Sequence, residues 1–278
     1  FPVTNAEWRC FMEAGGYDEE RWWDTAAATR WQRGEGTADD AKAEDRKFRR
    51  TLHENPDLPK KRLAEGRITS QQAEAWEWYR DASEADFERQ LDQWYPAGRQ
   101  TQPSFWNDPA YNHPAQPVVG ICWYEARAYC AWLLVQTGHE FRLPTEAEWE
   151  AAARGPAGRR YAWGGEFDAA RCNAFETHVR GTTPIGIFPR GDTPEGLSDM
   201  TGNVWDWTSS LFEPYPYAAD DGRENIDADG PRVLRGGSWD SLRFVCRCAA
   251  RLHARPGLRH LDLGFRLCCA PPSRTAAR

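Results

Sequence analysis

The chain lacks any long apolar segment. No run of about eighteen apolar residues, the length that crosses a bilayer, occurs in the sequence, and the mean hydropathy is -0.79. The start FPVTNAEW also lacks the basic and then apolar pattern of a secretory signal peptide. We therefore expect a cytoplasmic protein with no membrane partner. Since the initiator Met is missing, an upstream domain removed by processing or trimming is left open.

The chain also lacks an excess of basic residues. Its formal net charge is -7, so no nucleic-acid partner that depends on phosphate neutralisation is expected. The eight cysteines include no pair of CxxC motifs, and the six histidines are scattered, which argues against structural zinc. Cys122 and Cys130 lie in a Trp- and Ala-rich helical stretch, and the adjacent Cys268 and Cys269 suit a disulfide poorly. Most cysteines are therefore expected to be buried thiols in a reducing compartment.

The residues that are present predict a mixture of helices and short strands. VTNAEWRCFMEA indicates a short strand followed by a helix that Thr4 or Asn5 caps. A second helix is expected from about 124 to 135. RLPTEAEWEAAARG predicts a third, in which Thr145 and Glu148 form a capping box. The remainder, rich in Gly, Pro, Asp and Asn, is typical of small strands and long loops.

Residues 24–95 differ from the rest in composition. They are charge-rich and helical in pattern, are interrupted by NPDLPKK, and offer Trp76, Trp78 and Tyr79 as inward-facing anchors. Their apolar content is too thin for a core of their own. We therefore predict a helical insertion within a single domain that spans residues 1–278, rather than a second domain.

Seven short boxes follow one another along the chain: VTNAEW, GICWYEARAYCAWL, RLPTEAEWEAAARG, YAWGGEFDAARCNAF, GLSDMTGNVWDWTSS, RVLRGGSW and GFR. With these boxes in this order, the chain resembles the sulfatase-modifying or formylglycine-generating enzyme superfamily. The resemblance implies an α+β, C-type-lectin-like fold of that type with a helical insertion. The boxes supply large Trp rings and glycines for tight backbone approaches. We expect them to build the scaffold rather than the activity.

The resemblance also implies a copper site, which this chain does not complete. Formylglycine-generating enzymes bind Cu(I) through two cysteines, and soft thiolates suit that ion. The corresponding positions hold Ser241 and Arg243, and only Cys246 lies between Trp239 and Arg247. The histidine triad of a related branch, the sulfoxide synthases of ergothioneine synthesis, is absent too. We expect no copper and no catalytic residue, and keep a formylglycine-generating type oxidase or a related enzyme as the alternative function.

Between Asp240 and Leu263 the chain has no Lys, Glu, Gln, Met or Trp. In target proteins of diversity-generating retroelements, error at the adenines of AAC codons gives NNC codons, which cannot encode these five types. The segment lies between GGSW and GFR and contains the box RCAAR, so it is similar to the variable region of those proteins. Loop composition could produce the same absence. A non-diversified interaction module of the same fold is therefore left open.

This second resemblance implies a non-catalytic variable protein that presents a hypervariable ligand-binding surface on a lectin scaffold, where side chains can change without touching the core. Exposed aromatic, Arg and apolar anchors suit an unknown protein or large ligand. Residues 240–263 are the predicted variable segment, with Arg247, Arg251, Phe265 and Arg266 expected to point into the scaffold. The predicted solvent-facing binding residues are Asp240, Ser241, Leu242, Arg243, Phe244, Cys246, Leu252, His253, Ala254, Arg255, Leu258, His260, Leu261 and Asp262.

The box GLSDMTGNVWDW implies a structural calcium ion, because the superfamily often binds calcium through this loop. Calcium prefers hard oxygen ligands such as carboxylates and backbone carbonyls. Asp199, the carbonyls of Gly202 and Val204, and Asp206 match the family's pattern. The alternative is that Asp199 caps a turn and Asp206 pairs with an arginine.

Overall fold

The helices begin at residues that can satisfy their free backbone donors. Thr145 Oγ1 accepts the Glu148 N–H at 3.1 Å, and the Glu148 carboxylate accepts the Thr145 N–H at 2.8 Å, at the start of α8 (Glu146–Arg154). This reciprocal pair is the predicted capping box, which is confirmed. Thr4 and Glu7 form the same pair at the start of α1 (Asn5–Glu13). The strongest local signals of the sequence therefore place helices correctly.

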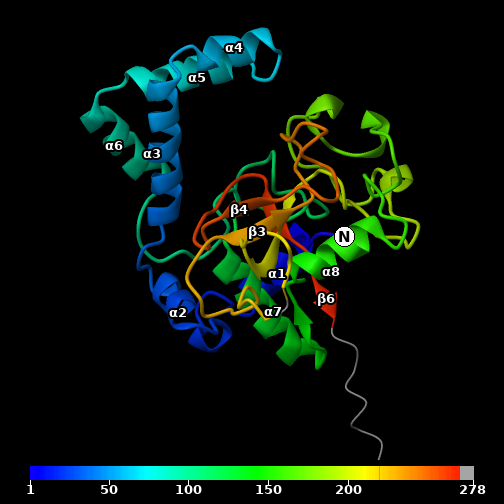
Figure 1. Cartoon of the computed structure of the whole chain (residues 1–278). Helices are drawn as coiled ribbons and strands as arrows, with labels where there is room; N and C mark the ends of the chain where they lie inside the picture. The colour runs from blue at the N-terminus through cyan, green and yellow to red at the C-terminus, as the bar shows by residue number, and fades with distance from the viewer. Residues whose placement is uncertain (219, 270–278) are drawn as a thin grey trace, which may run out of the picture. The chain divides into compact units, whose positions relative to one another are not determined.

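The computed structural model describes residues 1–218 and 220–269, and the chain divides into two compact units (Figure 1). The first unit joins Phe1–Arg33 to the chain from Gln100 onward, and the second is Gly34–Arg99. The remaining helices of the first unit are η1 (Glu20–Trp22), α2 (Ala26–Gln32), α7 (Trp123–Thr137), η2 (Ala169–Arg171), η3 (Phe175–Thr177) and η4 (Pro189–Gly191). Its strands are β1 (Phe141–Arg142), β2 (Trp205–Leu211), β3 (Arg232–Arg235), β4 (Leu252–Ala254), β5 (Leu263–Phe265) and β6 (Cys268–Cys269).

A four-stranded sheet of order β4-β3-β2-β5 forms the centre of the first unit. The pairs β2–β3 and β3–β4 are antiparallel, and β5 runs parallel to β2, with Trp207 opposite both Leu234 and Phe265. A second, two-stranded sheet pairs β1 with β6. The two strands at the edges of the main sheet, β4 and β5, both come from the last part of the chain. The predicted variable segment is therefore built into the sheet at two places.

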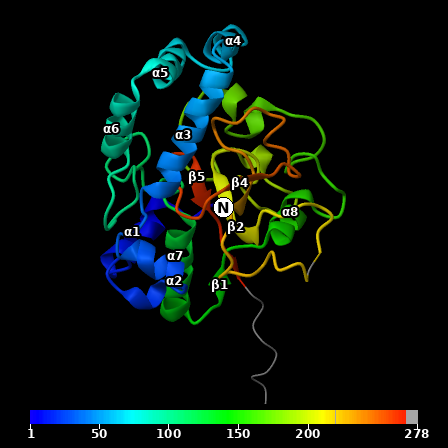
Figure 2. The ribbon, with the colours of Figure 1, turned by 60° about the vertical axis from the view of Figure 1, so that its left-hand side comes forward.

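Large aromatic rings fill the space between the sheet and the helices α1 and α7, which lie side by side next to the sheet (Figure 2). Trp8 of α1 stacks on Tyr129 of α7, with ring centroids 5.4 Å apart and planes 10° apart, and meets the Phe265 ring edge-on at 5.8 Å. Trp207 is fully buried in the same cluster. Most tryptophans of the boxes thus act as core residues, as the sequence predicts, whereas Trp163 is only partly buried.

The second unit consists of the helices α3 (Asp39–Glu54), α4 (Leu58–Ala64), α5 (Ser70–Asp81) and α6 (Glu84–Trp94). Leu52, Phe87 and Leu91 are fully buried, so this unit has a small apolar centre. Its boundary differs from the expected residues 24–95, because α2 belongs to the first unit. The helical pattern alone could not separate α2 from the helices that follow it.

The aromatic residues expected to anchor this second unit behave differently from one another. Trp76 and Tyr79 contact the Phe48 ring edge-on, at centroid distances of 5.0 and 5.8 Å. Trp78 keeps 37% of its surface exposed.

Across the described residues, no helix is both long enough and apolar enough to span a membrane.

Candidate functional site

The predicted variable segment follows β3 and the GGSW turn, and its backbone is tied to several other loops. The Phe175 N–H donates to the Ser241 carbonyl at 3.0 Å, and the Cys248 N–H donates to the carbonyl of Arg160 at 2.9 Å. Figure 1 shows this part of the chain in orange beside the green loops of residues 155–200. These bonds fix part of the path of the segment through main-chain atoms, whatever side chains stand at these positions.

Three arginines anchor the segment and its end to the core. Each guanidinium reaches a carboxylate that is almost completely buried. The pairs are Arg251 with Glu146 at 2.7 Å, Arg259 with Glu125 at 3.1 Å, and Arg266 with Asp206 at 2.6 Å. Breaking a buried pair of this kind costs about 3–5 kcal/mol, because one charge remains without a partner. The anchors therefore hold the segment against the scaffold.

The arginines of the segment were predicted with mixed success. Arg251 and Arg266 point into the scaffold as expected. Arg247 does not: it is exposed, and its Nε donates to the Phe244 carbonyl at 2.7 Å, so it closes a local turn while Cys248 takes the buried position. Arg259 was missed. The signal for it was Glu125, a carboxylate in the first turn of a core helix, which needs a cation nearby.

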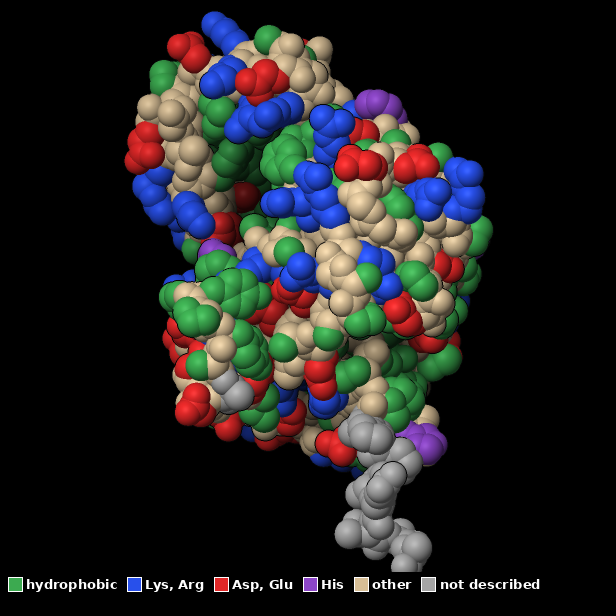
Figure 3. Space-filling view, turned by 45° about the vertical axis from the view of Figure 1, so that its right-hand side comes forward, with side chains coloured by type: hydrophobic (Ala, Val, Ile, Leu, Met, Phe, Trp, Pro, Cys, Tyr) green, Lys and Arg blue, Asp and Glu red, His purple; other side chains and the backbone are tan. Residues whose placement is uncertain are grey.

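Most of the predicted binding side chains reach solvent. The exposed residues are Asp240, Arg243, Phe244, Leu252, His253, Arg255 and His260, and the partly buried ones are Ser241, Leu242, Leu258, Leu261 and Asp262. Phe244 and Leu252 keep 49% and 43% of their surface exposed. Figure 3 shows basic, acidic and hydrophobic side chains intermingled on the face that it displays. The exposed residues of the segment thus offer all three kinds of contact.

Two of the predicted solvent-facing residues are buried, so that part of the prediction is wrong. Cys246 is fully buried beneath Gly237, where an added Cβ would lie 2.6 Å from the Cys246 sulfur. Ala254 pairs with Arg232 in the main sheet and is also buried. Both burials depend on partners that are distant in sequence, so the pattern of the segment did not reveal them.

A polar network lies at the end of the segment. His260 Nδ1 is 2.5 Å from Asp262 Oδ1, the Ser238 hydroxyl donates to Asp262 Oδ2 at 2.8 Å, and the Ser238 and Ser241 hydroxyl oxygens are 3.1 Å apart. Burial acts to raise the pKa of Asp262, but His260 and these hydrogen bonds lower it. The carboxylate lies between the hydroxyl and the imidazole. Because Asp262 separates them, Ser238 and His260 do not form the serine–histidine hydrogen bond that activates a nucleophile.

The residues expected to bind calcium are arranged around an arginine. Asp206 Oδ2 accepts from Arg266 Nε at 2.6 Å and from the Trp149 indole N–H at 2.8 Å, and Arg266 also donates to the Asp199 carbonyl at 2.8 Å. The Asp199 carboxylate accepts the Gly186 N–H at 2.9 Å. Within the described residues, no group of three acidic, His or Cys side chains is placed to hold a metal. The geometry fits the arginine alternative better than a shared cation, and calcium at Asp199, Gly202, Val204 and Asp206 stays a prediction.

The only thiol between Trp239 and Arg247 does not resemble a copper ligand. Cys246 lies with Cys172 in a small buried cluster, and its Sγ is 3.5 Å from the Ser241 carbonyl. Burial raises the pKa of Cys246 well above its ordinary value, and it raises the pKa of Cys172 to about 12. Cys246 is therefore a buried residue of this small cluster and not a solvent-exposed thiol.

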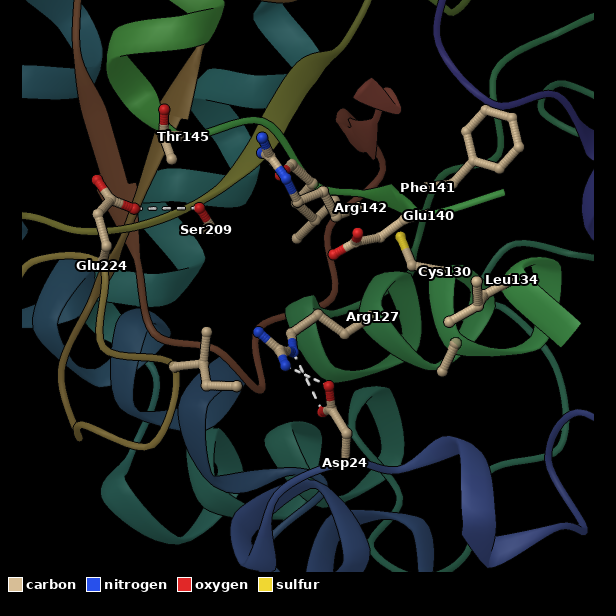
Figure 4. Close-up of a pocket in the computed structure, with 13 residues that line it drawn as sticks. Asp24, Arg127, Cys130, Leu134, Glu140, Phe141, Arg142, Thr145, Ser209 and Glu224 are labelled. Carbon is tan, nitrogen blue, oxygen red and sulfur yellow. Dashed lines mark hydrogen bonds and ion pairs between the residues drawn. The ribbon is translucent and has the colours of Figure 1, made fainter. Parts of the chain in front are cut away.

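Two large cavities of the first unit lie away from the predicted binding residues. One of about 470 Å³ is lined by Asp24, Arg127, Cys130, Ser209 and Glu224 among others (Figure 4). Several of its charged groups are partnered within the protein: Arg127 pairs with Asp24, and Glu224 accepts from Ser209 at 3.2 Å. The other, of about 500 Å³, is apolar and is lined mainly by residues of α1 and α7. Neither is lined by a predicted binding residue, so the candidate site is a surface rather than a cavity.

Among curated proteins, the chain is 30% identical over 287 aligned residues to the hercynine oxygenase of Mycolicibacterium thermoresistibile, covering 99% of this chain and 51% of that protein. It is 42% identical over 176 residues to the formylglycine-generating enzyme of Streptomyces coelicolor, covering 55% of this chain and 52% of that enzyme. The chain thus spans about half the length of these curated relatives.

A solved structure, Treponema denticola variable protein 1, matches with 26% identity and a TM-score of 0.51, over 61% of this chain and 75% of that one. The profile of the Sulfatase-modifying factor enzyme 1-like domain matches residues 1–271. Together with the mixed helix-and-sheet architecture, these matches confirm the C-type-lectin-like fold of the formylglycine-generating type. The chain belongs to the family of proteins that carry a sulfatase-modifying factor enzyme 1-like domain.

Proposed function

We propose that this chain is a ligand-binding variable protein of a diversity-generating retroelement, and that residues 240–263 form its variable segment. The observation that carries the proposal is that the segment contains two kinds of residue, some anchored to the scaffold and others exposed to solvent. Its anchors, Arg251 and Arg259, pair with buried carboxylates, whereas Phe244, Leu252 and Arg255 reach solvent. The likeness to Treponema denticola variable protein 1 supports the same reading.

With this arrangement, the exposed side chains could be substituted with little loss of folding stability. Substitutions of exposed residues outside special contacts change stability by about 0.5 kcal/mol or less. Replacing Phe244, Leu252 and Arg255 together by serine should therefore leave the melting temperature nearly unchanged, while binding of the partner is lost. The partner would be a protein or another large ligand, because these residues are exposed and line neither of the two cavities described above.

The coding locus provides the sharpest test. A retroelement target gene requires a nearby reverse transcriptase and an adenine-rich near-copy of the DNA that encodes residues 240–263. We expect both elements close to this gene, with mismatches confined to adenines of the near-copy. A complete locus and genome that contain neither element would refute the proposal and leave an interaction module of the same fold.

An oxidase of the formylglycine-generating or hercynine oxygenase type is the second candidate, because sequence relatives with those names align with the chain. The contacts weigh against the copper version, since Ser241 and Arg243 stand at the expected thiol positions and Cys246 is buried. Incubation with Cu(I), oxygen and a CxPxR peptide tests it. Loss of the peptide thiol with formation of formylglycine would establish the oxidase. No turnover, with Streptomyces coelicolor formylglycine-generating enzyme active in parallel, is the result expected here.

A further inference from the structure

Three exposed arginines lie at one end of the candidate surface without a carboxylate partner. Arg160, Arg243 and Arg247 are all exposed, and none forms an ion pair with any residue that the structure describes. Their neighbours behave differently: Arg154 pairs with Glu150 at 2.6 Å, and Arg159 pairs with Glu195 at 2.7 Å. Glu150 and Glu195 are therefore already paired with other arginines.

Hydrogen bonds bring the chain at Arg160 and Tyr161 next to the chain at Arg243 and Arg247, although these residues come from two parts of the sequence. The Tyr161 hydroxyl donates to the Arg243 carbonyl at 3.0 Å, and the Arg160 carbonyl accepts the N–H that follows Arg247 in the chain at 2.9 Å. Burial raises the pKa of Tyr161, while the charges of Arg160, Arg247 and Arg243 all act to lower it. All three positive charges thus act on the pKa of the same hydroxyl.

Aromatic rings lie among these charges. Tyr161 stacks on Trp163 with centroids 5.4 Å apart and planes 11° apart, and Phe167 meets it edge-on at 5.5 Å. Phe244 is half exposed, and its carbonyl accepts a hydrogen bond from Arg247 Nε. Arginine and aromatic side chains are enriched in the centres of protein–protein interfaces, so this composition suits a protein partner.

One carboxylate does touch the patch, and it is already occupied. Both oxygens of Glu176 lie 3.1 Å from the backbone N–H of Arg243, which orients the loop. The guanidinium groups remain available to an outside anion, and a planar guanidinium matches a carboxylate through two parallel hydrogen bonds. The patch is positive on a chain whose net charge is -7, so it is a local feature and not a property of the whole surface.

We propose that Arg160, Arg243, Arg247 and Phe244 bind an acidic segment of a partner protein, whose Asp or Glu carboxylates pair with the three guanidinium groups. This inference rests on the proposed function and specifies the chemistry of its partner. A nucleic acid is the less suitable occupant, because the acidic chain as a whole repels a long polyanion.

The test uses the full chain and two labelled peptides, one in which Glu alternates with Phe and one in which Gln replaces every Glu. Binding is followed by fluorescence anisotropy at increasing NaCl. We expect the acidic peptide to bind, the Gln peptide to bind at least about tenfold more weakly, and affinity for the acidic peptide to fall with salt. Replacing Arg160, Arg243 and Arg247 together by alanine should reduce affinity at least about tenfold.

The matched control replaces Arg9, Arg30 and Arg190 of the first unit by alanine, because these exposed residues carry the same total charge and are not members of the patch. It should bind the acidic peptide nearly as the parent does. The inference is overturned if the parent does not bind the acidic peptide, if the Gln peptide binds equally well, or if the patch variant, folded by its melting temperature, keeps the parent's affinity. Tighter binding of an oligothymidylate, lost in the same variant, would overturn it in favour of nucleic acid. The locus test of the proposed function can succeed or fail independently of each outcome.

Discussion

Replacing Arg251 should destabilise the first unit strongly, although the residue lies at the edge of the predicted variable segment. Its guanidinium contacts both oxygens of Glu146, which is fully buried, and donates to the Glu213 carbonyl at 3.0 Å. In Arg251→Met the Glu146 carboxylate would keep only the Tyr215 hydroxyl at 3.2 Å and the more distant Arg235, whose nitrogen is 3.9 Å away. The expected loss is about 3 kcal/mol, the lower end of the cost of breaking a buried pair. It corresponds to a fall in melting temperature of about 6–12 °C for a unit of this size.

Urea denaturation and thermal melting of four variants, Arg251→Met, Glu146→Gln, the double variant and a control, would measure this loss. The control is Arg247→Met, a neighbouring arginine whose exposed side chain has no carboxylate partner among the described residues, and it should cost about 0.5 kcal/mol or less. The double variant Arg251→Met with Glu146→Gln should be less destabilised than the sum of the two single changes, because the buried charge has gone. Equal stability of the Arg251 and Arg247 variants would refute the assignment of Arg251 as an anchor.

Two further predictions concern metal and thiols. A calcium ion at Asp199, Gly202, Val204 and Asp206 predicts that chelation lowers the melting temperature and that added calcium restores it, since an ion bound only to the folded state stabilises it; an unchanged melting temperature would contradict the calcium site and favour the pairing of Asp206 with Arg266 alone. Under native conditions at mildly alkaline pH, iodoacetamide should modify the exposed Cys10 well before Cys246, because burial removes access and raises the pKa of the Cys246 thiol. Mass spectrometry of the digested protein measures both rates, and early labelling of Cys246 would show that its cluster opens readily.

Local signals in the sequence identified the elements whose structure depends on near neighbours. The capping box of Thr145 and Glu148 places α8 correctly, because both partners lie within one helical turn. The burial of Cys246 and Ala254 could not be found in this way. One depends on the approach of Gly237, which has a φ of 77°, and the other on pairing with β3. The burial of Ala254 is decided by the sheet register, which the short and irregular pattern of the segment does not specify.

The orientation of the segment's arginines follows from charge balance rather than from periodicity. Three boxes that the sequence suggests as scaffold, WYEA, TEAEW and WDW, each contain one carboxylate that is fully or almost fully buried. A buried carboxylate requires a cation, so three arginines must turn inward, and Arg251, Arg259 and Arg266 do so. The remaining arginines of the segment, among them Arg243 and Arg247, have no such carboxylate to meet and therefore face solvent. The same residue type is thus buried as an anchor where a scaffold carboxylate faces it, and it stays exposed where none does.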